Sequence, residues 1–123
     1  MTELTTIGLS EAGDTKLDEL KELGIFAEKM DGYRFAVALG IAQGVVPQEI
    51  AKRKPFLNIG SLDPDQLLKQ SVESLFEDDL RETTPYRLIE RLAEWGVNEL
   101  YAQAQTKDID FVALLEQVEN KAS

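Results

Sequence analysis

The feature that most constrains the fold is a run of eight residues, 35–42, with no charged or hydrogen-bonding side chain: Phe-Ala-Val-Ala-Leu-Gly-Ile-Ala. A helix that is apolar on every side is a buried helix. Half of these residues are Ala or Gly, which are poor strand formers, and this favours a helix over a strand. Asp31 suits the N-cap and Gly44 the left-handed C-terminal position. The sequence therefore predicts a buried helix over residues 31–43, whose small residues let neighbouring helices approach closely.

Composition narrows the chemistry open to the chain. Its 123 residues include no cysteine and no histidine, so disulfides, thiolate zinc sites and Ser-His-Asp catalysis are excluded. Carboxylate, lysine or tyrosine chemistry remains, but nothing marks a catalytic pair, and we predict no catalytic, cofactor-binding or metal-binding residues. The longest apolar run is far shorter than the roughly 20 residues that span a bilayer. With no signal-peptide pattern at the N-terminus, we expect a soluble, cytoplasmic protein that does not bind membranes.

The hydrophobic pattern predicts a mainly α fold, a single compact domain over residues 1–123 with about five helices. Residues 4–10 alternate weakly and favour one short strand, and a first helix follows over residues 14–23, with Asp14 as its cap. Residues 45–62 show no clear period and are expected to form a long loop. We divide the chain into a strand-helix-helix dimerisation part, a long loop and an acidic helical part, over residues 1–44, 45–62 and 63–120.

Two proline-marked starts open the acidic helical part. Asp63 and Thr84 are expected to be N-caps, since Pro64 and Pro85 suit the first helical position. The first of these helices is expected to stop near Phe76. Gly96 either permits close packing or divides the second helix in two. A last helix, capped by Asp108 or Asp110, is predicted with four residues on one face: Phe111, Leu114, Leu115 and Val118.

Charge is unevenly distributed along the chain. The net charge is −10: residues 1–60 hold seven basic and nine acidic residues, and residues 61–123 hold six and fourteen. The acidic second half repels phosphate backbones. Lys52, Arg53 and Lys54 form the only triple basic run, and they are either phosphate contacts or a solvated loop. Acidic residues 77–79 with Glu82 are either a Mg²⁺ or Ca²⁺ site or a solvated turn, since they lack the spacing of an EF-hand loop.

A single strand in an otherwise helical chain leaves an unpaired edge, which a second copy could cover. The order of strand 4–10, helix 14–23 and helix 31–43 resembles the ribbon-helix-helix (Arc/MetJ-like) family. It also resembles, more faintly, the small E component of bacterial DNA phosphorothioation systems. The first resemblance implies a dimer whose strands pair across a two-fold axis and whose paired strands bind DNA. We expect the dimer core to be formed by four residues of the buried helix: Phe35, Val37, Leu39 and Ile41.

DNA reading by such a strand pair would use Thr6, Gly8 and Ser10, which offer two hydroxyls and no charge. The interpretation we favour is therefore a non-enzymatic, dimeric protein-interaction module of a bacterial-type regulatory or DNA-processing system, with a protein partner on the acidic half. We do not expect the isolated protein to bind nucleic acid tightly at physiological salt. Two alternatives stay open: a ribbon-helix-helix-like DNA-binding regulator and a carboxylate-based metal-dependent enzyme.

Overall fold

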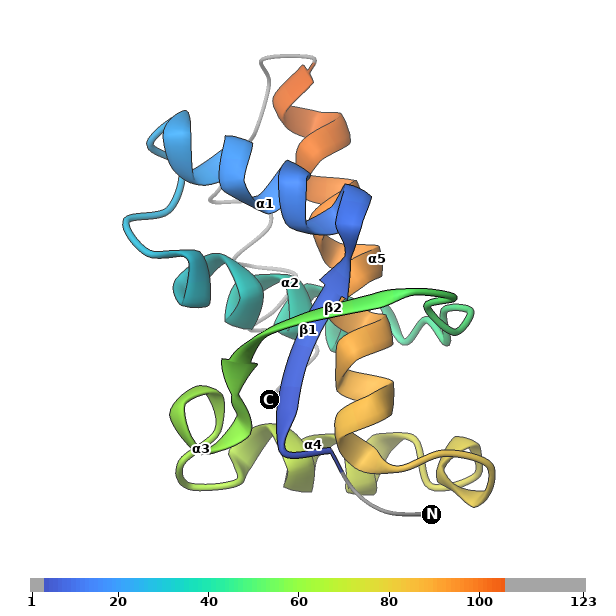
Figure 1. The fold of residues 1–123 in the computed structure, drawn as a ribbon. Coiled ribbons are helices and arrows are strands. Elements are labelled where there is room, and N and C mark those ends of the chain that lie inside the picture. Colours follow the sequence, from blue (N-terminus) through green and yellow to red (C-terminus); the bar gives the residue numbers. More distant parts are fainter. Residues whose placement is uncertain (1–3, 106–123) are drawn as a thin grey trace.

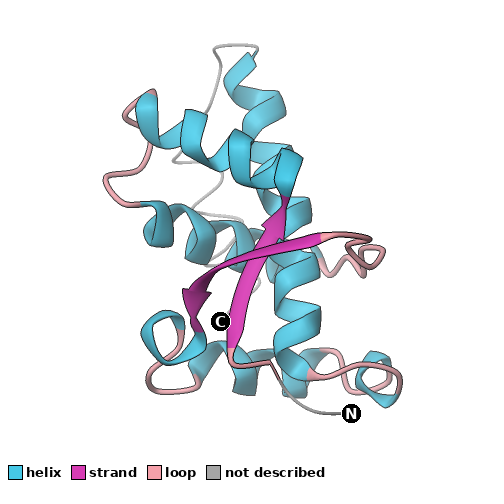
Figure 2. Ribbon diagram, in the orientation of Figure 1, coloured by secondary structure: helices cyan, strands magenta, loops and turns pink. Residues whose placement is uncertain are grey.

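The computed structural model describes residues 4–105, which form a mainly helical fold with one two-stranded antiparallel sheet (Figures 1 and 2). A 3₁₀ turn at Asp79–Arg81 precedes the last described helix. In chain order the helices and strands are β1 (Thr6–Ser10), α1 (Glu11–Glu22), α2 (Lys29–Gln43), β2 (Arg53–Asn58), α3 (Ile59–Leu62), α4 (Leu67–Leu75) and α5 (Pro85–Gln105).

Helix α5 is the element that most of the others contact. Helix α1 packs near its C-terminal end, α4 near its N-terminal end, and α2 crosses its middle (Figure 1). The crossing is close because both helices carry glycine there. A methyl group on Gly96 would overlap the backbone of Ala36, and one on Gly40 would press on Leu92. Gly96 therefore permits close packing and does not divide the helix, which continues to Gln105.

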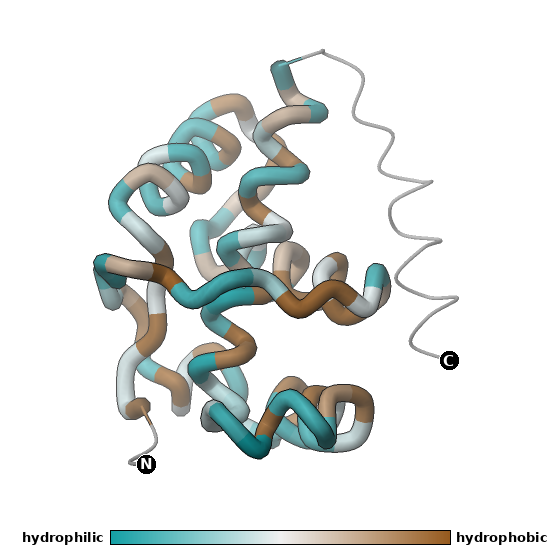
Figure 3. Tube along the Cα trace, turned by 90° about the vertical axis from the view of Figure 1, so that its right-hand side faces the viewer, coloured by the Kyte–Doolittle hydropathy of each residue, from teal (hydrophilic) through white to brown (hydrophobic). Residues whose placement is uncertain are grey.

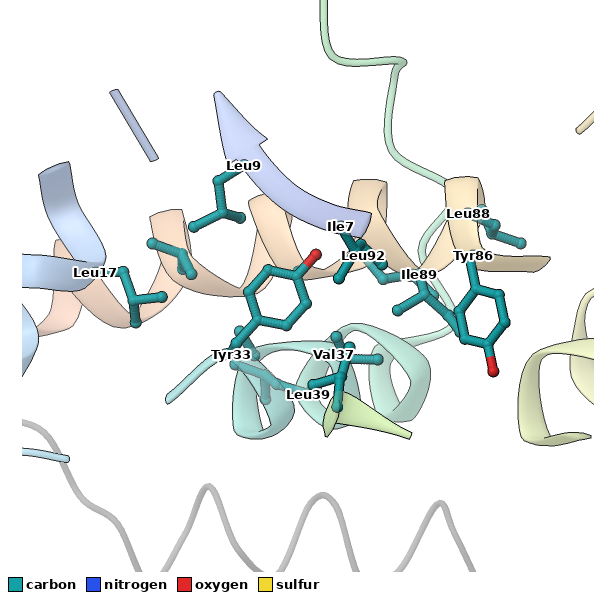
Figure 4. Close-up of a cluster of buried hydrophobic side chains, with 14 of the residues drawn as sticks. Ile7, Leu9, Leu17, Tyr33, Val37, Leu39, Tyr86, Leu88, Ile89 and Leu92 are labelled. Carbon is teal, nitrogen blue, oxygen red and sulfur yellow. The ribbon is translucent and has the colours of Figure 1, made fainter. Parts of the chain in front are cut away.

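One hydrophobic cluster joins α1, α2, α5 and β1. The side chains of Ile7, Leu17, Val37 and Leu92 are fully buried in it (Figure 4). Tyr33 inserts its ring among these residues and donates its hydroxyl to the carbonyl of Gly8, at 2.8 Å. Burial, with the nearby negative charges of two glutamates, raises the pKa of Tyr33 well above its usual value, so the phenol stays protonated as a donor.

Strand β1 pairs with β2 of the same chain, and this corrects two of our expectations. Residues 45–62 are not simply a loop, because they contain β2 and α3. The strand also has a mate, with Thr6 opposite Asn58 and Ser10 opposite Arg53, so the chain does not need a second copy to cover this edge. Lys54 and Pro55 obscured β2 in the sequence, because proline interrupts a strand pattern and lysine does not alternate with apolar residues there.

The other edge of β1 is covered by side chains. Glu90 accepts a hydrogen bond from the Gly8 amide at 2.9 Å, and Glu94 accepts one from the Ser10 amide at 3.2 Å. The guanidinium of Arg53 reaches across from β2, contacting Glu90 at 3.0 Å and donating to the carbonyl of Thr6 at 2.9 Å. Both edges of β1 are therefore satisfied within one chain.

The first two helices begin earlier than the sequence indicated. Helix α1 begins at Glu11, capped by the Ser10 hydroxyl, which accepts from the Gly13 amide at 3.0 Å. Asp14 is not its cap but lies inside the helix and pairs with lysines. Helix α2 begins at Lys29, two residues before the expected cap Asp31, and ends as predicted before Gly44, whose φ is 67°.

The two proline-marked starts have different outcomes. Thr84 directly precedes α5 and Pro85 is its first residue, as predicted, but the Thr84 hydroxyl is buried with no hydrogen-bond partner in the described part of the chain. Asp63 directly follows α3, and α4 begins only at Leu67, so the prediction that Asp63 is the N-cap position and Pro64 the first residue of this helix is wrong. Its carboxylate still caps α4, because it accepts from the amides of Leu68 and Lys69 at 3.0 and 3.1 Å.

The helix predicted from Asp108 or Asp110 to Val118 lies outside the described residues. Between residues 4 and 105, no helix combines the length and the apolar character that crossing a membrane requires. Hydrophobic and hydrophilic residues are interspersed along the chain trace (Figure 3). The turn before α5, residues 77–84, is mostly hydrophilic.

Candidate interaction surface

The four residues expected to form a dimer core are placed in two environments. Val37 and Leu39 are buried in the chain's own hydrophobic cluster, where they face other elements of the same copy. Phe35 and Ile41 are only half-buried and pack at the margin of that cluster. The burial of α2 was predicted correctly, but its partner over most of its surface is α5.

The triple basic run does not form one patch. The Arg53 side chain points inward to Glu90, whereas the Lys54 ammonium contacts Asp14 at 3.1 Å and Lys52 is exposed to solvent. Alternation along β2 explains the separation, because neighbouring residues of a strand project to opposite faces. Two of the three candidate phosphate contacts are thus paired with carboxylates of the same chain.

The sheet offers little surface for strand pairing or for DNA reading. Gly8 is buried, and Ser10 is engaged with Glu94, to which its hydroxyl donates at 2.6 Å. The outer edge of the sheet is β2, which presents Lys54 and Pro55. Lysine and proline are residues that discourage edge-to-edge association of strands. The predicted ribbon face is consequently committed to contacts inside one copy.

Asp14 is a buried carboxylate near the sheet that two lysines contact. It is buried between Lys29 and Lys54, with Lys29 bridging to Asp18 as well. Burial alone would raise the pKa of Asp14, but hydrogen bonds and charge from the two lysines outweigh it and lower that pKa. The same contacts raise the pKa of Lys29 against the opposing effect of its own burial. These ion pairs connect α1, α2 and β2 and stabilise their packing.

Exposed apolar side chains lie on a different surface, between α2 and α4. Two adjacent hollows lie between α2 and α4, and together we call them the α2–α4 groove. The first hollow, of about 380 Å³, is lined among others by Arg34, Ala38, Leu62, Asp65, Leu67 and Leu68. The second, of about 320 Å³, is lined among others by Ile41, Ala42, Val46, Leu75, Phe76 and Asp79. The order of these residues shows that α2 and α4 run in the same direction along the groove.

Exposed leucines stand beside each hollow. Leu67 is 60% exposed and Leu75 is 57% exposed, although both belong to the apolar face of α4. Val72 and Phe76 are the members of that face that reach the core. Helical spacing shows which residues share a face, but it does not show how much of that face a neighbouring element covers.

The wall of the groove is held in place by polar contacts. Arg34 on α2 donates to the carbonyls of Leu62 and Ser61, at 3.0 and 2.9 Å, which fixes α3 beside α2. The buried carboxylate of Asp63 accepts from the Tyr86 hydroxyl at 2.9 Å in addition to the α4 amides. A surface whose backbone is anchored on both sides is preformed, which is typical of binding sites.

The acidic side chains of the described residues do not gather into a metal site. Among residues 4–105 there is no group of three or more acidic side chains placed to hold a metal ion. The acidic turn that we considered as a metal site has exposed Glu77 and Asp78, and Asp78 pairs with Arg81 at 3.5 Å. The α2–α4 groove is therefore the best-formed candidate site of the described chain.

Comparison with protein-family models, with curated protein sequences and with solved structures gives no match in any of the three.

Proposed function

We propose that the protein is a non-enzymatic interaction module in which two copies associate through the α2–α4 groove. The observation that carries this proposal is that the same surface presents protruding leucines and hollows able to receive them. Leu67 and Leu75 are eight residues apart, about 12 Å along the helix. A two-fold axis would place the α4 helices of two copies antiparallel. Leu67 of each copy would then face the second hollow of the other, and Leu75 the first.

This arrangement is self-complementary, as a two-fold interface requires. It also differs from the dimer that the strand pattern predicted, since it uses no strand edge. Of the four residues expected in the dimer core, it retains Ile41, which lines the second hollow.

The energetics point to a weak, concentration-dependent dimer. Burying the exposed part of one leucine contributes about 1.5 kcal/mol, so four leucines contribute about 6 kcal/mol before the cost of association. Burial of Val46 and Ile41 in both copies adds about 3 kcal/mol, and the cost of association subtracts at least about 4 kcal/mol. The remainder, about 5 kcal/mol, leads us to expect a dissociation constant between about 0.1 and 1 mM.

Salt should strengthen this dimer. Each copy carries a net charge of −10, and acidic residues such as Asp65 and Asp79 lie on the rim of the groove. Salt screens repulsion between exposed charges and leaves the burial of leucine intact. Raising the ionic strength from about 0.02 to 0.3 M should lower the dissociation constant, whereas an association driven by ion pairs would weaken.

Sedimentation equilibrium over about 10 µM to 1 mM protein tests the proposal, a range set by the expected affinity. Leu67→Asp and Leu75→Asp should each abolish the dimer. Leu23→Asp is the matched control, because Leu23 is 63% exposed on the loop after α1, away from the groove, and the substitution adds the same charge. The proposal is wrong if the wild-type chain stays monomeric throughout this range, or if Leu23→Asp disrupts association as strongly as the groove variants.

A further inference from the structure

Three of the five arginines in the chain line one small hollow between α5 and the loop that joins α2 to β2. Arg87 and Arg91 lie one turn apart on α5, and Arg53 is the first residue of β2. The other lining residues of this arginine hollow are Glu49, Ile50 and Glu90. Its volume is about 60 Å³. This is about twice the share of one water molecule in the liquid, so the hollow suits one small polar group.

We propose that the arginine hollow binds a single phosphate group, either free phosphate or the phosphate of a small monoester. The guanidinium group of arginine is well matched to phosphate, because its N–H donors are fixed in a fork and its charge is permanent. The proposal does not depend on the dimer, since none of the residues that line the arginine hollow lines the α2–α4 groove.

Arg87 is the arginine of the hollow that lacks a partner. It is exposed, and its guanidinium makes no hydrogen bond or ion pair with any residue between 4 and 105. All of its N–H donors are therefore available to a ligand. Arg91 lies four residues later on the same face of α5, and like charges at this spacing repel each other. An anion bound between the two arginines would remove this repulsion.

The other two guanidinium groups are held in place and still keep free donors. Arg53 donates from Nε to Glu90 at 3.0 Å and from Nη2 to the carbonyl of Thr6 at 2.9 Å. Arg91 donates from Nε, at 2.7 Å, and from Nη2 to the carbonyl of Pro47, which holds the loop beside α5 (Figure 1). Within the described part of the chain, Nη1 of both arginines makes no hydrogen bond. Donors fixed before a ligand arrives lose little entropy on binding.

The charges around the hollow favour an anion. Glu90 is buried, and its carboxylate accepts from the Gly8 amide and balances the charge of Arg53. The other two arginines face one further carboxylate, that of the exposed Glu49. Because Glu49 weakens the attraction and the whole chain carries a net charge of −10, we expect modest affinity. A dissociation constant of about 0.1–10 mM for phosphate is consistent with this balance.

An NMR titration of the full-length protein with inorganic phosphate tests the proposal. At about pH 7.5 a phosphate group is mostly dianionic. Phosphate replaces sodium chloride at constant ionic strength, so that the screening of exposed charges stays the same. We expect saturable shifts at the amides of Ile50 and Arg87, which flank the hollow, and none at Arg81 in the turn before α5.

Two pairs of variants give effects of opposite sign. Arg87→Gln should weaken phosphate binding about tenfold, because it removes charge-assisted donors from an exposed position. Arg81→Gln is its matched control, with the same loss of charge outside the hollow and no expected change in affinity. Glu49→Gln removes the opposing carboxylate and should tighten binding about threefold, whereas Glu73→Gln, at an exposed position of α4, should not. A gain in affinity cannot result from damage to the fold.

A parallel titration with methyl phosphate distinguishes the two sources of the phosphate group. Methyl phosphate that binds at least as tightly as inorganic phosphate assigns the site to a monoester, and weaker binding of methyl phosphate assigns it to free phosphate. The proposal is overturned if inorganic phosphate causes no saturable shifts up to about 50 mM, well above the expected dissociation constant. It is also overturned if Arg81→Gln weakens binding as much as Arg87→Gln does, or if Glu49→Gln fails to tighten it.

Discussion

Two surfaces of this small molecule differ in how far its own side chains cover them. The edge of β1 that does not pair with β2 is covered, whereas the α2–α4 groove is exposed. At the strand edge, backbone groups that could pair with another chain are covered by Glu90, Glu94 and Arg53. In the groove, Leu67 and Leu75 are left more than half exposed beside hollows of about 380 and 320 Å³. This contrast is the reason for our proposal that the chain associates through apolar helix faces and not through strands.

Removing a polar side chain that covers the edge of β1 should have the largest effect on the free energy of unfolding. Glu90→Ala removes the acceptor of the buried Gly8 amide and the ion-pair partner of Arg53, which would keep only its hydrogen bond to the Thr6 carbonyl. We expect a loss of about 3 kcal/mol in the free energy of unfolding, measured by urea denaturation. Glu99→Ala, at an exposed position of the same helix, is the control and should change this free energy by less than about 0.5 kcal/mol. Similar values for the two variants would show that the covered edge contributes little.

A smaller loss of stability is expected when the Asp63 carboxylate, which anchors the wall of the groove, is removed. Asp63→Ala removes the acceptor for two α4 amides and for the Tyr86 hydroxyl, and we expect a cost of about 2 kcal/mol. By contrast, Thr84→Val should cost little, because the Thr84 hydroxyl makes no hydrogen bond among the described residues. Thermal unfolding of the two variants side by side measures this difference, and an equal loss would contradict the assignment of Asp63 as the cap that matters.

The Asp14 carboxylate, which Lys29 and Lys54 contact, makes the free energy of unfolding depend on pH. The pKa of Asp14 is lowered in the folded state, so its stabilisation is present above the unfolded value near 3.9 and is lost as the pH falls through the folded value. The raised pKa of Lys29 acts in the other direction, and its stabilisation is lost as the pH rises through the folded value, above about 10.4.

Asp14→Asn should therefore destabilise the protein by about 1–2 kcal/mol at pH 7 and flatten the acid limb of its stability profile. Urea denaturation between pH 3 and pH 7 provides the measurement. An unchanged slope below pH 4 would show that the lysines do not lower the pKa of Asp14.

The smallest effect on stability is expected at the groove itself. Leu67→Asp and Leu75→Asp replace exposed side chains, so each should alter the free energy of unfolding of the monomer by no more than about 0.5 kcal/mol. The same variants should abolish association. A large loss of stability in either one would mean that these leucines support the fold and are not free to bind.

Sequence patterns predicted the elements whose cause is local. Eight apolar residues marked α2 as buried, Gly44 ended it, and Pro85 opened α5. They missed β2, because the partner that makes residues 53–58 a strand lies more than 40 residues away in β1. They also could not separate Val37 and Leu39 from Ile41, since a helix that is apolar on all sides does not show which face meets its own chain.

The groove was missed for a related reason. Leu67, Val72 and Leu75 form a regular apolar pattern, and the natural prediction is that the core covers all of them. Whether a neighbour reaches each residue depends on how α4 lies against α5, which no local pattern contains. The sequence does carry a usable signal, because four of the nine residues of α4 are large and apolar, and only Val72 among them is fully buried.

Concentration-dependent NMR shift mapping of the wild-type protein tests directly whether copies associate through the α2–α4 groove, because it reports on the groove and the sheet at once. Between about 10 µM and 1 mM, the range set by the expected affinity, we expect shifts at Ile41, Leu67 and Leu75 and none along β2. Shifts confined to β2, around Lys54 and Phe56, would contradict it, and so would a spectrum that does not change with concentration.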